Sequence, residues 1–117
     1  MRLSDKQSEF ATAIAKLITW ANKRQDMRVR LGWAYDPPGS NSGRGASSNH
    51  RARLAVDLIL DVWDGSRWVY ATDTESYRKL GEKWWSIDER CEWGGESRAG
   101  RHRGDGNHFS FKHNGRW

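Results

Sequence analysis

The sequence predicts a single α+β domain over residues 1–117, in which a small antiparallel sheet is flanked by helices. Its length of 117 residues suits one hydrophobic core. Eight tryptophans supply apolar surface to that core, although the mean hydropathy is low. The expected order is helix, strand, long loop, hairpin, helix, long loop and strand, which is typical of an α+β domain with an antiparallel sheet.

The N-terminal third predicts a helix, a strand and a loop. Apolar residues recur every three or four positions, as on the buried face of a helix, at Phe10, Ala13, Ile14, Leu17, Ile18 and Ala21. Ser4 is expected to cap this helix. Residues 27–35 alternate like a strand, and residues 36–49 are dense in Pro, Gly, Ser and Asn. A loop of that length in a small domain favours a function beyond mere connection.

The middle of the chain predicts a hairpin. Residues 53–63 are rich in apolar and β-branched side chains, which indicates a strand. Asp64-Gly65 is a common hairpin turn, and residues 67–71 return as the partner strand.

The last third predicts a helix, a loop and a strand. Thr72 or Thr74 is expected to cap a helix that ends near Ile87. A loop rich in Gly and Arg then covers residues 94–107, and residues 108–111 form a short final strand.

The charge of the chain suits an anionic partner. Lys and Arg number 20 against 15 Asp and Glu, which leaves a formal net charge of +5. Such a balance is compatible with nucleic acid, a membrane surface or a bacterial envelope polymer, and it does not choose among them. No segment has the length and apolarity of a membrane span, and the N-terminus lacks the pattern of a signal peptide. We therefore expect synthesis in a cytoplasm and no stable membrane insertion.

Cys91 is the only cysteine, so an intramolecular disulfide and a four-cysteine zinc site are excluded. We interpret it as a small, partly buried residue rather than a catalytic thiol.

Two imidazoles and two carboxylates lie at the ends of predicted rigid elements. His50 precedes the apolar run that contains Asp57, and Asp105 stands three residues before His108. Catalytic zinc uses three protein ligands and an open position, with a nearby carboxylate to accept a proton. A cation would also explain a carboxylate within an apolar strand. Because strand residues alternate in direction, His50 must lie in a turn, with a bend before Arg53.

These residues also resemble a known family. Ser48-Asn49-His50-Arg51-Ala52-Arg53-Leu54-Ala55-Val56-Asp57, followed by Asp105-Gly106-Asn107-His108, is similar to SxHxxxxAxD and DxxH of one group of bacterial and phage enzymes. These are the zinc D-alanyl-D-alanine carboxypeptidases and L-alanyl-D-glutamate endopeptidases, whose fold also occurs in hedgehog signalling domains.

The resemblance implies a role for each residue. His50, Asp57 and His108 would bind one Zn²⁺ ion. Asp105 would be the general base that deprotonates the attacking water and later protonates the leaving amine. Ser48 would orient a ligand or serve only as a turn residue. His102 is either solvated or stabilises the tetrahedral intermediate.

The chain departs from the family at the substrate clamp. Many members hold a carboxylate of the peptide with an arginine, where this chain has Asp36. Arg44 or Arg53 are the substitutes that the sequence offers. Many members also carry glycine where this chain has Arg53, although phage members often have Arg-Leu-Ala there.

The resemblance implies a phage or prophage enzyme that hydrolyses an amide bond in peptidoglycan stem peptides. It would be a monomer that reaches the cell wall after release from the host cytoplasm. One alternative is a zinc-containing module of the same fold that binds the wall without hydrolysis. Another is a nucleic-acid binder, although acidic residues interrupt its basic loop and no recognised binding motif is present.

Overall fold

The computed structural model describes residues 1–35 and 49–117. It contains two α-helices, a single 3₁₀ turn and a five-stranded sheet in the described residues. The elements are α1 (Leu3–Asn22), β1 (Met27–Leu31), β2 (Ala55–Trp63), β3 (Trp68–Tyr70), η1 (Thr74–Tyr77), α2 (Arg78–Ile87), β4 (Cys91–Trp93) and β5 (His108–Phe111). The α+β class with a small antiparallel sheet is confirmed.

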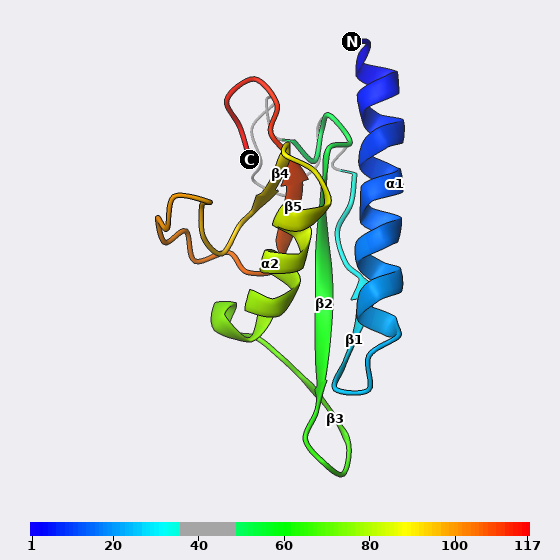
Figure 1. Ribbon diagram of the computed structural model, residues 1–117, viewed down its shortest axis with the longest axis vertical. Helices are drawn as coiled ribbons and strands as arrows, with labels where there is room; N and C mark the ends of the chain where they lie inside the picture. The colour runs from blue at the N-terminus through cyan, green and yellow to red at the C-terminus, as the bar shows by residue number, and fades with distance from the viewer. Residues whose placement is uncertain (36–48) are drawn as a thin grey trace.

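The long strand β2 organises the sheet (Figure 1). The strand order is β1-β2-β5-β4, and every pairing between these strands is antiparallel. One edge of β2 pairs with β1 along most of its length. The other edge is shared, because β5 pairs with residues 55–57 and β3 with residues 61–63.

The two faces of β2 have different environments. Val56, Leu58 and Leu60 are buried and belong to the hydrophobic core with residues of both helices. Asp57 and Asp61 alternate with them and therefore lie on the opposite face of the sheet. Polar side chains on that face are thus presented away from the helical layer.

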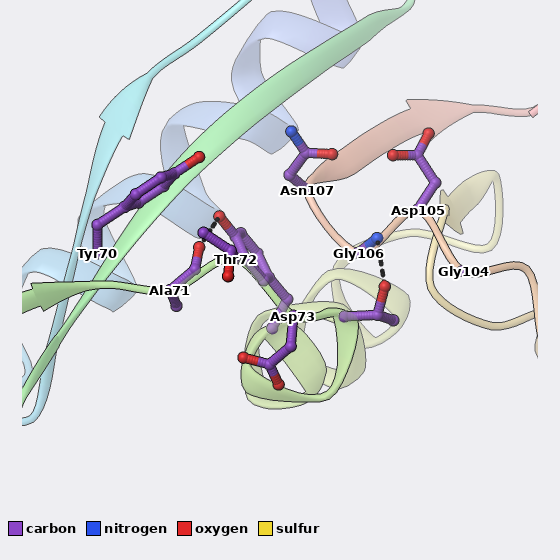
Figure 2. A pocket seen from close by; sticks show the side chains of 10 residues that line it. Tyr70, Ala71, Thr72, Asp73, Gly104, Asp105, Gly106 and Asn107 are labelled. Carbon is purple, nitrogen blue, oxygen red and sulfur yellow. Dashed lines mark hydrogen bonds between the residues drawn. The ribbon is translucent and has the colours of Figure 1, made fainter.

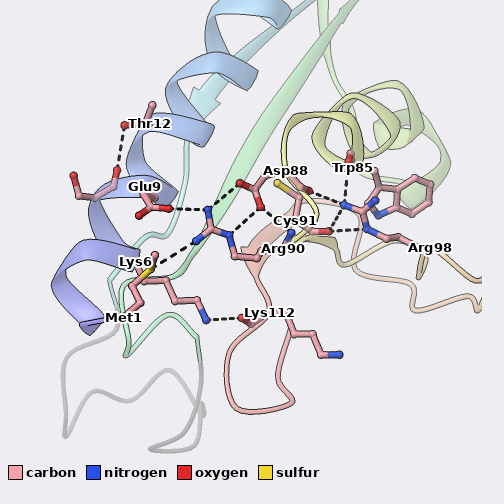
Figure 3. Close-up of polar contacts among 11 residues, drawn as sticks. Met1, Lys6, Glu9, Thr12, Trp85, Asp88, Arg90, Cys91, Arg98 and Lys112 are labelled. Atoms are coloured by element: carbon pink, nitrogen blue, oxygen red, sulfur yellow. Dashed lines mark hydrogen bonds and ion pairs between the residues drawn. The ribbon is translucent and has the colours of Figure 1, made fainter.

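Arginine side chains join β4 to the helices (Figure 3). Arg90 contacts Glu9 of α1 at 2.9 Å and Asp88 at 2.8 Å. Arg98 donates to the carbonyl oxygens of Trp85 and Asp88, at 3.0 and 2.7 Å. These contacts tie the ends of the short edge strand to both helices.

Two predicted helix caps are wrong. The first helix begins at Leu3 with Arg2 as its N-cap, so Ser4 already lies in the first turn and makes no capping hydrogen bond. At the second helix, Asp73 is the N-cap of the preceding 3₁₀ turn. Its carboxylate accepts the Ser76 N–H at 3.0 Å, and a carboxylate is a stronger acceptor there than a threonine hydroxyl.

Two predicted strands are shorter than expected. The first ends at Leu31 because Gly32 and Trp33 both stand opposite Asp57, as in a β-bulge. Gly32 N–H donates to Asp57 O at 2.9 Å, and Asp57 N–H donates to Trp33 O at 2.6 Å. The second strand begins at Ala55, since Arg53 has a φ of 58° that no strand residue adopts.

Within the described residues, no helix is both long enough and apolar enough to cross a membrane.

Candidate metal centre

The register of the sheet places Asp57 directly opposite His108. Leu58 N–H donates to Asn107 O, and Phe111 N–H donates to Leu54 O, both at 2.9 Å. Asp57 and His108 lie between these bonded positions, so they form a non-hydrogen-bonded pair of the antiparallel ladder. Side chains approach most closely in such pairs. A carboxylate and an imidazole are thereby brought together by backbone pairing alone.

A turn before β2 brings in His50, as the sequence predicted. The turn covers residues 49–53, and Leu54 N–H donates to Asn49 O at 2.8 Å. The buried Asn49 side chain donates to Phe111 O at 2.9 Å and so fixes the turn to β5. The left-handed backbone of Arg53 then turns the chain into the strand.

The hydrogen bond of His50 determines which ring nitrogen faces the site. His50 Nδ1 lies 2.9 Å from Ala34 O, and a carbonyl oxygen only accepts, so Nδ1 carries the proton. Nε2 is directed instead at Asp57, with 3.4 Å between Nε2 and Oδ1. This arrangement is the usual support of a metal-binding histidine, whose outer nitrogen is held by a carbonyl or carboxylate.

The three side chains fit a metal ion. Each offers a ligand atom, and these atoms all lie within 4.8 Å of one another. Two ligands about 2.0–2.1 Å from a tetrahedral zinc ion are roughly 3.3 Å apart. The distances to Asp57 Oδ1 are 3.4 Å from His50 Nε2 and 3.7 Å from His108 Nδ1. His108 Nε2 is buried and has no hydrogen-bond partner among the described residues.

The site keeps its carboxylate ionised. Burial raises the pKa of the Asp57 carboxyl, but hydrogen bonding and positive charge from His108 and His50, which these imidazoles supply when protonated, outweigh it. The pKa therefore lies well below its usual range. Both imidazoles are almost fully buried, while 17 % of the Asp57 side chain is exposed. An ionised carboxylate between two imidazoles is a ready set of ligands for a divalent cation.

Asp105 lies outside this three-residue group, in the turn that leads into β5. It is exposed, and its carbonyl oxygen accepts the His108 N–H at 3.2 Å. A Cβ on Gly94 would stand 2.2 Å from that carbonyl oxygen and 2.7 Å from the His108 Cβ. Only glycine leaves room for this turn, which fixes Asp105 and His108 relative to each other.

A polar pocket of about 140 Å³ adjoins Asp105 (Figure 2). Asp105 and Asn107 lie on one side of it, and Tyr70 and Thr72 lie on the other. It occupies the place where the neighbour of β2 changes from β5 to β3. The carboxylate of Asp105 is exposed at the edge of this pocket, next to the turn that leads to His108.

The other predicted site residues are more scattered. Arg53 is exposed, with its guanidinium 4.3 Å from the centre of the Tyr35 ring. His102 is exposed and pairs through the backbone with Glu96 in the loop before Asp105. Neither belongs to the three-residue group. Arg44 and Ser48, as well as Asp36 and the rest of residues 36–48, lie outside the described residues.

Sequence reasoning missed Trp117 as a neighbour of His108, together with the contacts of the Trp117 ring. The His108 ring packs edge-on against Trp117, with 5.6 Å between ring centroids. The guanidinium of Arg103 lies 4.1 Å from the centre of the Trp117 ring and contacts Glu92 at 3.2 Å. No motif signalled these contacts, since they join segments that only the sheet brings together.

No protein-family model matches the chain, and a search of curated proteins finds no match.

Proposed function

We propose that this protein is a zinc-dependent peptidase that hydrolyses an amide bond in peptidoglycan stem peptides, of the D-alanyl-D-alanine carboxypeptidase or L-alanyl-D-glutamate endopeptidase type. The observation that carries the proposal is the convergence of His50, Asp57 and His108. An exposed carboxylate, Asp105, is joined to the same strand by a tight turn. The order and spacing of these four residues favour this family over other zinc hydrolases.

The donor set supports zinc. Two imidazoles and one carboxylate are a common zinc-binding combination in hydrolases, whereas magnesium and calcium prefer oxygen ligands. The same combination also suits ferrous iron, so metal analysis belongs to the test. A zinc ion held here would polarise the scissile carbonyl and lower the pKa of the attacking water.

Four residues of the chain would bind the metal and transfer the proton. His50, held by Ala34 O, presents Nε2, and Asp57 and His108 complete the ligand set. Asp105 accepts the proton of the attacking water and returns it to the leaving amine, a task that its exposure permits.

An exposed arginine is the candidate for binding the substrate. Arg53 has an exposed guanidinium that is steadied by Tyr35, so it supports a role in binding a substrate carboxylate. Arg44, Ser48 and His102 remain candidates by resemblance. The same resemblance favours a monomeric phage or prophage enzyme that acts on the wall after release from the host cytoplasm.

The test combines metal content with wall hydrolysis. Purified protein should contain about one zinc per chain and release new amino groups from peptidoglycan, with the bond identified by mass spectrometry of the fragments. A chelator should abolish the release, and Asp105→Asn should abolish it while zinc is retained. Zinc without hydrolysis in the unaltered protein would favour a binding module. Wall lysis that survives Asp105→Asn or zinc removal would refute the proposal.

The chain offers a matched control for metal binding. Asp57→Asn should lose zinc and the rise in melting temperature that zinc produces. Asp61→Asn changes a carboxylate on the same face of β2, but Asp61 is bound by Arg28 and Arg30 at 2.8 and 3.0 Å. It should lower the melting temperature and leave the zinc-induced rise intact. Loss of that rise in both variants would show that it reflects general destabilisation.

A further inference from the structure

A groove on the helical side of the molecule carries lysines and no carboxylates. It lies between α1 and the end of α2 and has a volume of about 690 Å³. It is lined by Thr12, Ala15, Lys16, Thr19, Trp20, Lys23, Lys83, Ser86 and Ile87. Because the helices cover the core face of the sheet, this groove lies on the opposite side from Asp57 and is separate from the candidate metal centre.

Two of the lysines come from the first helix and the third comes from α2. Lys16 lies on α1 and Lys23 is the C-cap residue of the same helix, seven residues further on, which is two turns and about 10 Å along one face. Lys83 faces them from α2, with its ammonium 5.6 Å from the centre of the Trp20 ring. No ion pair links any of the three to a carboxylate of the described residues.

Three carboxylates near the groove already have cationic partners. Glu9 and Asp88 at one end contact Arg90. Asp26 at the other end contacts Arg24 and Lys79. The three lysines of the groove therefore form a positive surface that an external anion could neutralise.

The shape and contents of the groove restrict that anion. A concave site with charges about 10 Å apart suits a chain with repeated charges better than a flat bilayer or a single phosphate. Single-stranded nucleic acids are bound through bases stacked on open aromatic rings. The Trp20 ring is half-buried and already contacted by Arg24 at 5.0 Å as well as by Lys83.

We propose that this groove binds a linear phosphate-bearing polymer with a non-aromatic backbone. The phosphates would contact the lysines, and the backbone of the polymer would lie over Ala15, Trp20 and Ile87. Such binding would hold the protein on an anionic envelope surface while the opposite face stays free. It requires neither the metal nor catalysis, so it stands or falls separately from the proposed peptidase activity.

The experiment compares two triple variants of equal charge. Lys16→Gln, Lys23→Gln and Lys83→Gln together neutralise the groove. Arg2→Gln, Arg101→Gln and Lys112→Gln remove the same charge from exposed positions outside it. Binding of fluorescent poly(glycerol phosphate) is measured by anisotropy between about 25 and 200 mM salt, after thermal melting shows that both variants fold.

We expect the groove variant to bind on the order of tenfold more weakly at low salt. The slope of its log binding constant against log salt concentration should be smaller by about two, because fewer counterions are released. The control variant should bind nearly as well as the unaltered protein. Equal loss in both variants would overturn the proposal in favour of unspecific charge attraction. Tighter binding of DNA or of anionic lipid vesicles, lost in the groove variant, would overturn the choice of partner.

Discussion

Gly81 stands in the middle of α2, where alanine is normally the better residue. Replacing glycine by alanine inside a helix stabilises it by about 1 kcal/mol. Here a Cβ would stand 2.2 Å from Cδ2 and 2.5 Å from Cε3 of Trp93. Since ordinary contacts begin near 3.4 Å, the indole ring or the helix would have to move by more than an ångström.

Trp93 has no room for such a movement. Its side chain is fully buried, and a Cβ on Gly95 would meet the same ring at 2.3 Å. Its indole N–H donates to Gly106 O at 2.7 Å. Overpacking costs about 1–3 kcal/mol, and loss of the hydrogen bond adds about 1 kcal/mol. Against the helix gain of about 1 kcal/mol, Gly81→Ala should destabilise the protein by about 1–3 kcal/mol.

Urea unfolding and thermal melting measure this difference. The melting temperature should fall by roughly 4–12 °C for a domain of this size. Ser86→Ala serves as the control, because Ser86 is exposed in the same helix and should change stability by less than about 0.5 kcal/mol. If Gly81→Ala equalled or exceeded the unaltered protein in stability, the packing of Trp93 against this helix would be refuted.

Three further predictions concern buried or charged groups. Tyr77→Phe should cost about 1–3 kcal/mol in urea unfolding, because the Tyr77 hydroxyl accepts Leu60 N–H and donates to Ala71 O, both at 3.1 Å; an unchanged midpoint would contradict this. Cys91 is fully buried, and burial raises its pKa to about 12, so a thiol reagent at pH 8 should label it only after unfolding. Rapid labelling of the folded protein would contradict that prediction. Hydrogen bonding to Arg90 lowers the pKa of Asp88 from 3.8 to about 2. The contribution of the Asp88 carboxylate to the free energy of unfolding is therefore present above pH 3.8 and is lost as the pH falls toward 2. The lowered pKa corresponds to at most about 2 kcal/mol of stability. Because 27 % of the Asp88 side chain is exposed, solvent screening reduces this contribution to about 1 kcal/mol. Unfolding of Asp88→Asn and the unaltered protein should therefore converge at low pH, and a constant difference from pH 5 to pH 2 would exclude this effect.

Elements with a long periodic pattern could be predicted from the sequence. Five of the six apolar positions predicted for α1 are buried and the sixth, Ile18, is partly buried against the core. The Asp64-Gly65 signal does mark the hairpin between β2 and β3. The position of His50 in a turn followed from the alternation of side chains along a strand. These features depend on residues that are close together in the chain, so the local sequence pattern predicts them.

Features that depend on distant segments could not be predicted. Strand β4 has only three residues, too few for a periodic signal, and pairs with β5 across the long loop. The bulge at Gly32 and Trp33 exists only because Asp57 stands opposite. The Ala34 carbonyl oxygen that orients His50 is a backbone atom, so no residue type could have revealed it.

Asp57 and Asp61 show why the sequence alone left the strand ambiguous. Both interrupt the same apolar run, and both point to the same face of β2. Asp61 is neutralised by Arg28 and Arg30, which alternate on β1 and keep their charge at any ordinary pH. Asp57 instead lies between two imidazoles, whose neutral form has a lone pair that a metal can bind. Arginine side chains offer no lone pair to a metal, and they already occupy the oxygens of Asp61. Asp61 therefore serves to join β1 to β2. Two imidazoles beside the Asp57 carboxylate instead form a candidate ligand set, so the proposed chemistry depends on Asp57.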